Sequence, residues 1–191
     1  MIRFNFSVID VCWIIFLIYW IFSSFFVKKS VVKRDPGWIL WRIAVVALII
    51  SFIRFDKSGA VSLFMSVLNN SLFSFKILGT VLTVLGLLVA ILARIYLGRN
   101  WSSYVTYKEN HELVTSGPYR LIRHPIYTGM LLMFTGAVLY YGMPLLFVFY
   151  AITAGVFIWR IGKEEKIMTK LFGKRYRDYI KKTKALIPFV A

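Results

Sequence analysis

The stretch IYTGMLLMFTGAVLYYGMPLLFVFYAITAGVFIWRI, residues 126–161, decides the fold class. It is apolar along its length, and its only charged residue is Arg160, next to its end. A helix that crosses a bilayer needs roughly 20 apolar residues, with a range of about 17–25. A Gly-Met dipeptide divides the stretch into two runs near that length, Ile126–Tyr141 and Pro144–Ile161. The sequence therefore predicts a tight hairpin of two membrane-spanning helices.

Three more apolar runs precede this hairpin: Val8–Val27, Trp38–Ile53 and Ile77–Leu97. The first is not typical of a secretory signal, because it is too long and because Lys28 and Lys29 follow where small residues should mark a cleavage site. We therefore expect five transmembrane helices in all.

The composition agrees with a membrane protein. Of 191 residues, 59% are hydrophobic and 17% are charged, whereas soluble domains are about 45–50% apolar and about a quarter charged. Aromatic residues make up 18% of the chain, which excludes a disordered protein. The lone cysteine, Cys12, excludes a disulfide framework and a cysteine-based metal cluster. We expect residues 1–191 to form a single all-α integral membrane domain.

The basic residues fall on alternate connections between the expected spans. The chain carries 24 Lys+Arg against 8 Asp+Glu, a net charge of +16. Most of the cations lie in the segments 28–37, 94–125 and 160–191, which five spans would place on one side of the membrane. The positive-inside rule makes this side cytoplasmic, with the N-terminus outside and the C-terminus in the cytoplasm. The charge therefore indicates topology and argues against nucleic acid as a partner.

An unusual polar segment, HELVTSGPYRLIRHPIYTG, occupies residues 111–129. Pro125 suits the first turn of the fourth expected span and disfavours helix at the preceding residue. Arg123 and His124 should then lie at a helix N-terminus, beside free backbone N–H groups. A basic patch flanking the membrane would account for these two residues alone. The crowding of further hydrogen-bonding side chains nearby favours a ligand instead: His111, Tyr119 and Tyr127.

A second unusual segment lies where the fifth expected span leaves the bilayer. Arg160 and Glu164 are spaced i, i+4, so on a continued helix they share a face, and Glu165 follows directly. One interpretation is an exposed ion pair worth well under about 1 kcal/mol. The other is a partly buried functional pair, because charges beside a membrane are costly and often functional.

The tail LFGKRYRDYIKKTKALIPFV, residues 171–190, predicts a basic amphipathic helix. Phe172, Tyr176 and Tyr179 share one face, while lysines and arginines take the others. Such a helix would lie on an anionic leaflet, cover a site, or merely stabilise the surface. Ile187-Pro188 should end it.

Together these segments resemble the isoprenylcysteine carboxyl methyltransferase family, a relative of the membrane phospholipid methyltransferases. The resemblance covers roughly residues 96–189. It rests on a Glu-Glu pair after a span hairpin, on the tail pattern from Phe172 to Pro188, and on a block around Arg-His-Pro. Membrane sterol reductases resemble the chain in that block alone. The block comprises Gly117, Tyr119, Arg123, His124, Pro125, Tyr127 and Gly129.

The resemblance implies S-adenosylmethionine as methyl donor, held on the cytoplasmic side by the regions 98–129 and 160–189. It implies that Arg160 and Glu164 orient the acceptor, a lipid or prenylated molecule that arrives from the bilayer. The cofactor-binding residues that it implies are Tyr119, Arg123, His124, Pro125, Tyr127 and Glu165.

Several alternatives stay open. The acceptor could be an isoprenylcysteine-like carboxylate, a phospholipid amine, a small thiol or a sterol-like molecule. A membrane reductase that uses NADPH and a non-enzymatic membrane adaptor are the other classes. The chain has no GxGxxG, P-loop, nucleophile-elbow or HExxH motif and only two histidines, so we expect neither a Rossmann site nor a metal site.

Overall fold

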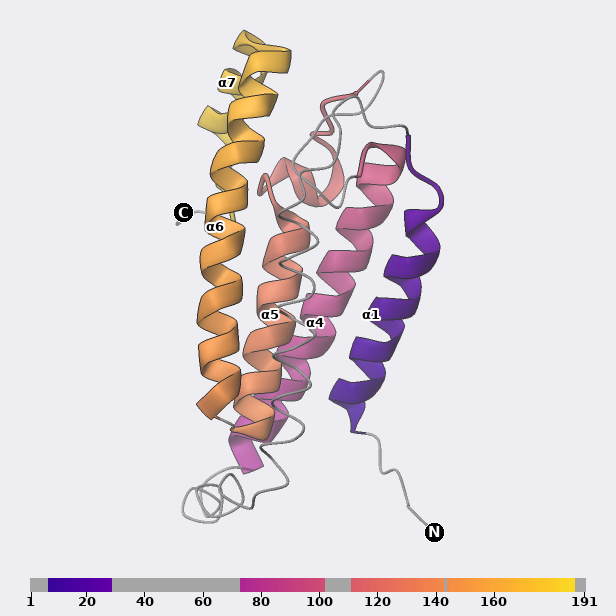
Figure 1. Cartoon of the computed structure of the whole chain (residues 1–191), viewed down its shortest axis with the longest axis vertical. Coiled ribbons are helices and arrows are strands. Elements are labelled where there is room, and N and C mark those ends of the chain that lie inside the picture. Colours follow the sequence, from indigo (N-terminus) through magenta and orange to yellow (C-terminus); the bar gives the residue numbers. More distant parts are fainter. Residues whose placement is uncertain (1–6, 29–72, 102–110, 143, 188–191) are drawn as a thin grey trace.

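A computed structural model describes residues 7–28, 73–101, 111–142 and 144–187, and Figure 1 shows their arrangement. The expected span Trp38–Ile53 lies outside the described residues. Within them the only β-type pairing is one bridge between Ile122 and Lys184, and an all-α fold class is confirmed. The helices are α1 Val8–Ser24, α4 Phe73–Leu97, α5 Pro125–Tyr141, α6 Pro144–Phe172 and α7 Lys174–Lys182, with short 3₁₀ helices at Gly98–Asn100 and Gly117–Arg120.

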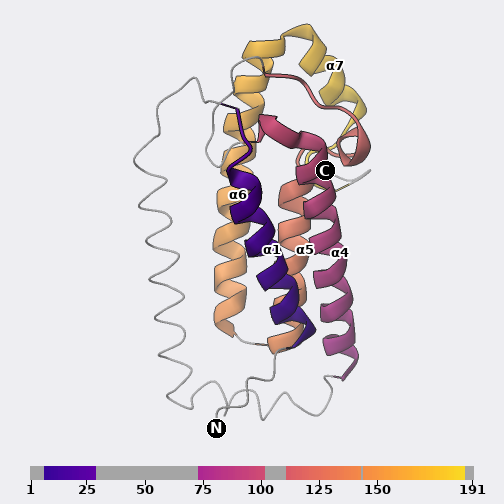
Figure 2. The ribbon, with the colours of Figure 1, turned by 90° about the vertical axis from the view of Figure 1, so that its right-hand side faces the viewer.

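The long helices α1, α4, α5 and α6 run alongside one another (Figures 1 and 2). Among the described residues, two stretches are long and apolar enough to cross a membrane, Ser74–Asn100 and Leu146–Phe172, while α1 and α5 are shorter apolar helices. Helix α6 continues well past Ile161, the end expected from hydropathy, and so carries Glu164 and Glu165 on the same helix as Arg160.

Helices α4 and α5 pack through small residues. A Cβ atom added to Gly129 would lie 2.6 Å from the backbone oxygen of Gly86 and 2.7 Å from the nitrogen of Ala90. Close backbone contact of this kind is how helices associate in a bilayer, where apolar side chains gain little by leaving lipid. The N-terminal turn of α5, which bears the unusual polar segment, is thereby fixed against α4.

Changing Gly129 to alanine should therefore destabilise the fold by about 1–3 kcal/mol, the usual cost of overpacking. Gly155→Ala on α6 is the matched control, because no described atom lies within 4 Å of a Cβ atom there. A helical alanine in open space should be neutral or stabilise by up to about 1 kcal/mol. Thermal unfolding in detergent measures both variants, and equal midpoints would contradict the close-packing account.

Helix α1 packs on α4 and α5 through a mostly aromatic stripe. Cys12 and Phe16 are buried against Leu87, Ala90 and Met133, so Cys12 is a packing residue of this interface. Near the other end of α1, the buried side chain of Arg94 donates hydrogen bonds to the carbonyl oxygens of Ser23 (2.7 Å) and Gly98 (2.6 Å). These bonds join α1 to the end of α4.

Gly173 separates the last two helices. Its φ of +55° lies in the left-handed region, which a glycine adopts without steric cost. Helix α7 then turns back toward the N-terminal end of α5 (Figure 2). Its buried residues are Tyr176 and Tyr179. The helix therefore covers the same end of the bundle at which the unusual polar segment lies.

Candidate active site

The chain tail is paired with the N-terminal end of α5 by backbone hydrogen bonds. The N–H of Arg123 donates to the oxygen of Lys184 at 2.8 Å, and the N–H of His124 donates to Ala185 at 3.0 Å. Pro125 is fully buried as the first residue of α5 and has no N–H to satisfy. These two backbone N–H groups, which lie at the expected helix start, are thus used by the tail and are not open to a ligand.

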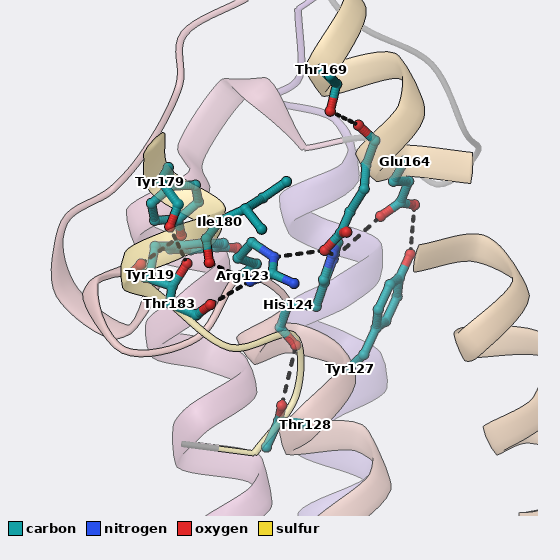
Figure 3. A network of polar contacts seen from close by, with 11 residues as sticks. Tyr119, Arg123, His124, Tyr127, Thr128, Glu164, Thr169, Tyr179, Ile180 and Thr183 are labelled. Carbon is teal, nitrogen blue, oxygen red and sulfur yellow. Dashed lines mark hydrogen bonds and ion pairs between the residues drawn. The ribbon is translucent and has the colours of Figure 1, made fainter. Parts of the chain in front are cut away.

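The side chains of Arg123 and His124 converge on one carboxylate of α6 (Figure 3). Arg123 donates from Nε to Glu165 Oε1 at 2.6 Å, and Nε2 of His124 lies 3.3 Å from the same oxygen. The guanidinium of Arg123 also donates to the backbone oxygens of Ile180 and Thr183 at the end of α7. One arginine therefore joins α5, α6 and α7.

The neighbouring carboxylate, Glu164, has a separate set of partners. Tyr127 donates its hydroxyl to Glu164 Oε1 at 2.7 Å, and Arg160 donates to the same oxygen at 3.3 Å. Nδ1 of His124 lies 3.6 Å from Glu164 Oε2. The contact between Arg160 and Glu164 that their i, i+4 spacing predicts is therefore present, and the imidazole of His124 lies between the two carboxylates.

This polar cluster is largely withdrawn from solvent. The side chains of Arg123 and His124 are each 10% exposed, whereas those of Arg160, Glu164 and Glu165 are 21–23% exposed. A surface pair would be worth little, but partial burial strengthens these contacts and restricts their geometry.

Aromatic rings form one wall of the cluster. The ring of Tyr127 stacks on His124, with centroids 5.7 Å apart, and on Phe157, with centroids 4.6 Å apart. The guanidinium carbon of Arg160 lies 5.8 Å from the centre of the same ring. Cations are attracted to such ring faces, so the wall suits a positively charged ligand group as well as Arg160.

Three tyrosines support the opposite side. The hydroxyl of Tyr179 donates to the backbone oxygen of Tyr119 at 2.6 Å. Burial raises the pKa of Tyr179 to about 12 and raises the pKa values of Tyr119 and Tyr176 well above their ordinary value. These hydroxyls remain protonated at neutral pH, so they can donate hydrogen bonds but do not act as bases.

Hydrogen bonds and ion pairs gather most of the predicted site residues in one place: Arg123, His124, Tyr127, Arg160, Glu164 and Glu165. Pro125 contributes by starting α5, directly after Arg123 and His124. Tyr119 lies beside Tyr179 and Thr183, away from Glu164, and its side chain packs in a cluster with Ala93 and Ile126. The ring centre of His111 lies 6.0 Å from that of Phe172 at the end of α6.

Three contributors were not predicted from the sequence: the ring of Phe157 and the backbone oxygens of Ile180 and Thr183. Phe157 precedes Arg160 and Glu164 by three and seven residues, and this helical spacing could have placed it on their face. The backbone oxygens of Ile180 and Thr183 carry no sequence signal, because a carbonyl is present at every residue. Within the described ranges, no group of three or more His, Cys, Asp or Glu side chains could hold a metal ion.

The arrangement suits binding and orientation rather than proton transfer. Two guanidinium groups balance two carboxylates, and a tyrosine hydroxyl and an imidazole complete the set. Such a site can hold a positively charged group against an aromatic face and align a carboxylate beside Arg160. Alignment alone can lower the barrier of a two-substrate displacement by about 7–11 kcal/mol.

Comparisons with known proteins find similarity to membrane methyltransferases. The profile of the family described as phospholipid methyltransferase matches residues 75–175. A probable protein-S-isoprenylcysteine O-methyltransferase of Oryza sativa subsp. indica is 32% identical over 115 residues, which cover 59% of this chain and 60% of the relative. Protein-S-isoprenylcysteine O-methyltransferase A of Arabidopsis thaliana is 33% identical over 115 residues, covering 59% of this chain and 58% of that one.

A solved structure is similar over more of the chain. It is that of the eukaryotic intramembrane Ras methyltransferase, an isoprenylcysteine carboxyl methyltransferase, with a TM-score of 0.63 and 26% identity. The match covers 84% of this chain and 55% of the solved one. The alignments thus span 60% or less of the length of these relatives.

Proposed function

This chain belongs to the phospholipid methyltransferase family, and we propose that it is an S-adenosylmethionine-dependent membrane methyltransferase that O-methylates the carboxylate of an isoprenylcysteine-like lipid. The family resemblance read from the sequence is confirmed by the profile match and by the isoprenylcysteine O-methyltransferases among its relatives. The observation that carries the proposal is the paired arrangement of Arg123 with Glu165 and of Arg160 with Glu164 around His124.

The residues present fit a sulfonium donor. Two partly buried carboxylates and the face of Tyr127 can hold a cation, and neighbouring guanidinium groups balance the negative charge of the carboxylates. S-adenosylmethionine, when bound, supplies an electrophilic methyl group. We assign its binding to His124, Tyr127 and Glu165, with Arg123 and Pro125 fixing the position of His124. Tyr119 supports the site through its contact with Tyr179.

The acceptor side is assigned to Arg160 and Glu164. Arg160 can grip a carboxylate through two parallel N–H donors, and Glu164 and the ring of Tyr127 hold its guanidinium in place. A terminal carboxyl group has a pKa of about 3.3–3.7 and is already ionised at neutral pH. The reaction therefore needs no general base, which agrees with a site made mainly of orienting contacts.

We propose five spans, with the N-terminus outside and both α7 and the site in the cytoplasm. The two long apolar helices and the basic residues at their ends support this topology. The lipid part of the acceptor would reach the site sideways along α6. Bulky apolar side chains on this helix are exposed, among them Phe147, Ile158 and Trp159.

Calorimetric titration of the full chain in lipid nanodiscs tests the class of enzyme. S-adenosylmethionine should give saturable binding with one site per chain, and NADPH should give none. Binding of NADPH without binding of the methyl donor would replace the proposal with a reductase. The absence of binding by either compound would favour a non-enzymatic membrane protein.

Changing Tyr127 to phenylalanine should lower kcat/KM for methyl transfer by about tenfold, since a hydrogen bond to a charged group is worth about 1.5–3 kcal/mol. The variant loses the hydroxyl that donates to Glu164 at 2.7 Å and keeps the stacked ring. Tyr140→Phe, at the far end of the same helix, is the control and should retain full activity. Equal losses in the two variants would count against a role for the Tyr127 hydroxyl.

A further inference from the structure

A basic pocket lies outside the candidate active site, between the turn that follows Gly117–Arg120 and the end of α7. Its volume is about 190 Å³. Four of its lining residues are cationic and exposed, and no acidic residue lines it. These four residues, here called the basic rim, are Arg120, Lys181, Lys182 and Lys184.

The pocket has walls that are held together by hydrogen bonds. The two segments that form it pair through the backbone, from Lys184 N–H to the oxygen of Leu121 at 3.5 Å and through the bridge between Ile122 and Lys184. Behind it, Arg123 donates to the backbone oxygens of Ile180 and Thr183. The basic rim is therefore carried on a defined scaffold rather than on a free basic tail.

A concave site lined by one sign of charge concentrates the field and attracts the opposite charge. Under the proposed topology the pocket lies at the cytoplasmic ends of the spans, where the leaflet carries anionic lipids. Apolar side chains adjoin the cations: Leu121 lines the pocket and is 55% exposed, and Ile180 is half-buried beside it. Cations beside exposed apolar surface match a lipid, which presents a phosphate next to acyl chains.

We propose that this pocket binds the phosphate-bearing headgroup of an anionic membrane lipid. The basic rim would contact the phosphate, and Leu121 would contact the start of the acyl chains. Zwitterionic phosphatidylcholine should bind less well, because its choline cation is repelled by the rim. The proposal requires only that this end of the chain faces the membrane surface and does not depend on methyl transfer.

The test is calorimetric titration of the detergent-purified full chain with each of three probes in separate experiments. The probes are short-chain phosphatidylglycerol, short-chain phosphatidylcholine and inorganic phosphate. The wild type should bind phosphatidylglycerol at least about tenfold more tightly than either other probe. The triple change Lys181→Ala, Lys182→Ala and Lys184→Ala should weaken this binding roughly 10–100-fold. The control triple, Lys174→Ala, Arg175→Ala and Arg177→Ala, removes the same charge from exposed positions of α7 outside the pocket and should change the affinity less than about twofold.

Equal losses in the two triples would mean a diffuse basic surface and would overturn the pocket. Inorganic phosphate binding as tightly as the lipid would overturn the lipid assignment, as would equal affinities for the two lipids. Thermal unfolding of both triples shows whether either has lost its fold. The charge-preserving triple Lys181→Arg, Lys182→Arg and Lys184→Arg should retain lipid binding. No methyl donor or acceptor is present in this experiment, so its failure is distinguishable from failure of the proposed enzyme activity.

Discussion

Glu165→Gln is expected to lower kcat/KM for methyl transfer by about 100-fold or more. Oε1 of Glu165 accepts a hydrogen bond from Arg123 at 2.6 Å and lies 3.3 Å from Nε2 of His124. Glutamine has nearly the same shape but carries no charge to balance a guanidinium that is 10% exposed. Each hydrogen bond to a charged group is worth about 1.5–3 kcal/mol, so weakening two of them costs roughly two powers of ten. Steady-state assays with a labelled methyl donor in nanodiscs measure the loss.

Glu112→Gln is the matched control for this change. The Glu112 carboxylate is 77% exposed and lies 3.6 Å from the ammonium of Lys28, an arrangement that contributes little. Its activity should equal that of the wild type. The methyl-donor affinity of Glu165→Gln should fall with its activity, because Glu165 is assigned to the donor. Full activity in Glu165→Gln would contradict a role of the Glu165 carboxylate in methyl transfer.

Arg160→Lys is expected to lower kcat/KM for the acceptor by about 30–100-fold, with most of the effect in the acceptor KM. Lysine keeps the charge but lacks the planar fork that binds a carboxylate through two hydrogen bonds. Because Arg160 lies on the Glu164 side of the cluster, the methyl-donor affinity should change less than about threefold. If Arg160 had only a structural role, its replacement would change the acceptor KM and the methyl-donor affinity together.

Lys163→Ala provides the comparison for Arg160→Lys. Lys163 is exposed on the same helix and lies 3.9 Å from the centre of the Trp159 ring, outside the polar cluster. Its removal should leave both kinetic constants near the wild-type values. A similar loss in both variants would show that positive charge on α6, rather than the Arg160 contact, controls the acceptor.

Much of the fold and part of the site follow from local sequence rules. Helix α6 begins at Pro144, as the hydropathy of residues 144–161 predicts, and Arg160 meets Glu164 because four residues make about one helical turn. Pro125 marks the start of α5 for an equally local reason, since proline suits the first helical turn.

The rest depends on contacts between residues far apart in the chain. Arg123 is 42 residues from Glu165 and 60 from Thr183, and no local periodicity encodes such partners. The tail was expected to contribute an amphipathic helix, but the pairing of Arg123 and His124 with the backbone oxygens of Lys184 and Ala185 has no sequence pattern. Hydropathy gives only the apolar part of α6, up to Ile161, because charged residues begin there although the helix continues to Phe172.

The central claim is that the methyl group is transferred to a carboxylate, and the type of bond that holds the transferred methyl group tests it most directly. The full chain in nanodiscs would be given a labelled methyl donor with an S-prenylcysteine whose carboxylate is free, and in parallel with the same compound as its methyl ester. We expect label only on the free acid, in a form that mild base releases as methanol, because the product is an ester. Label that resists base, on a phospholipid amine or a thiol, would contradict the carboxylate assignment, and no transfer to any of these acceptors would contradict the enzyme itself.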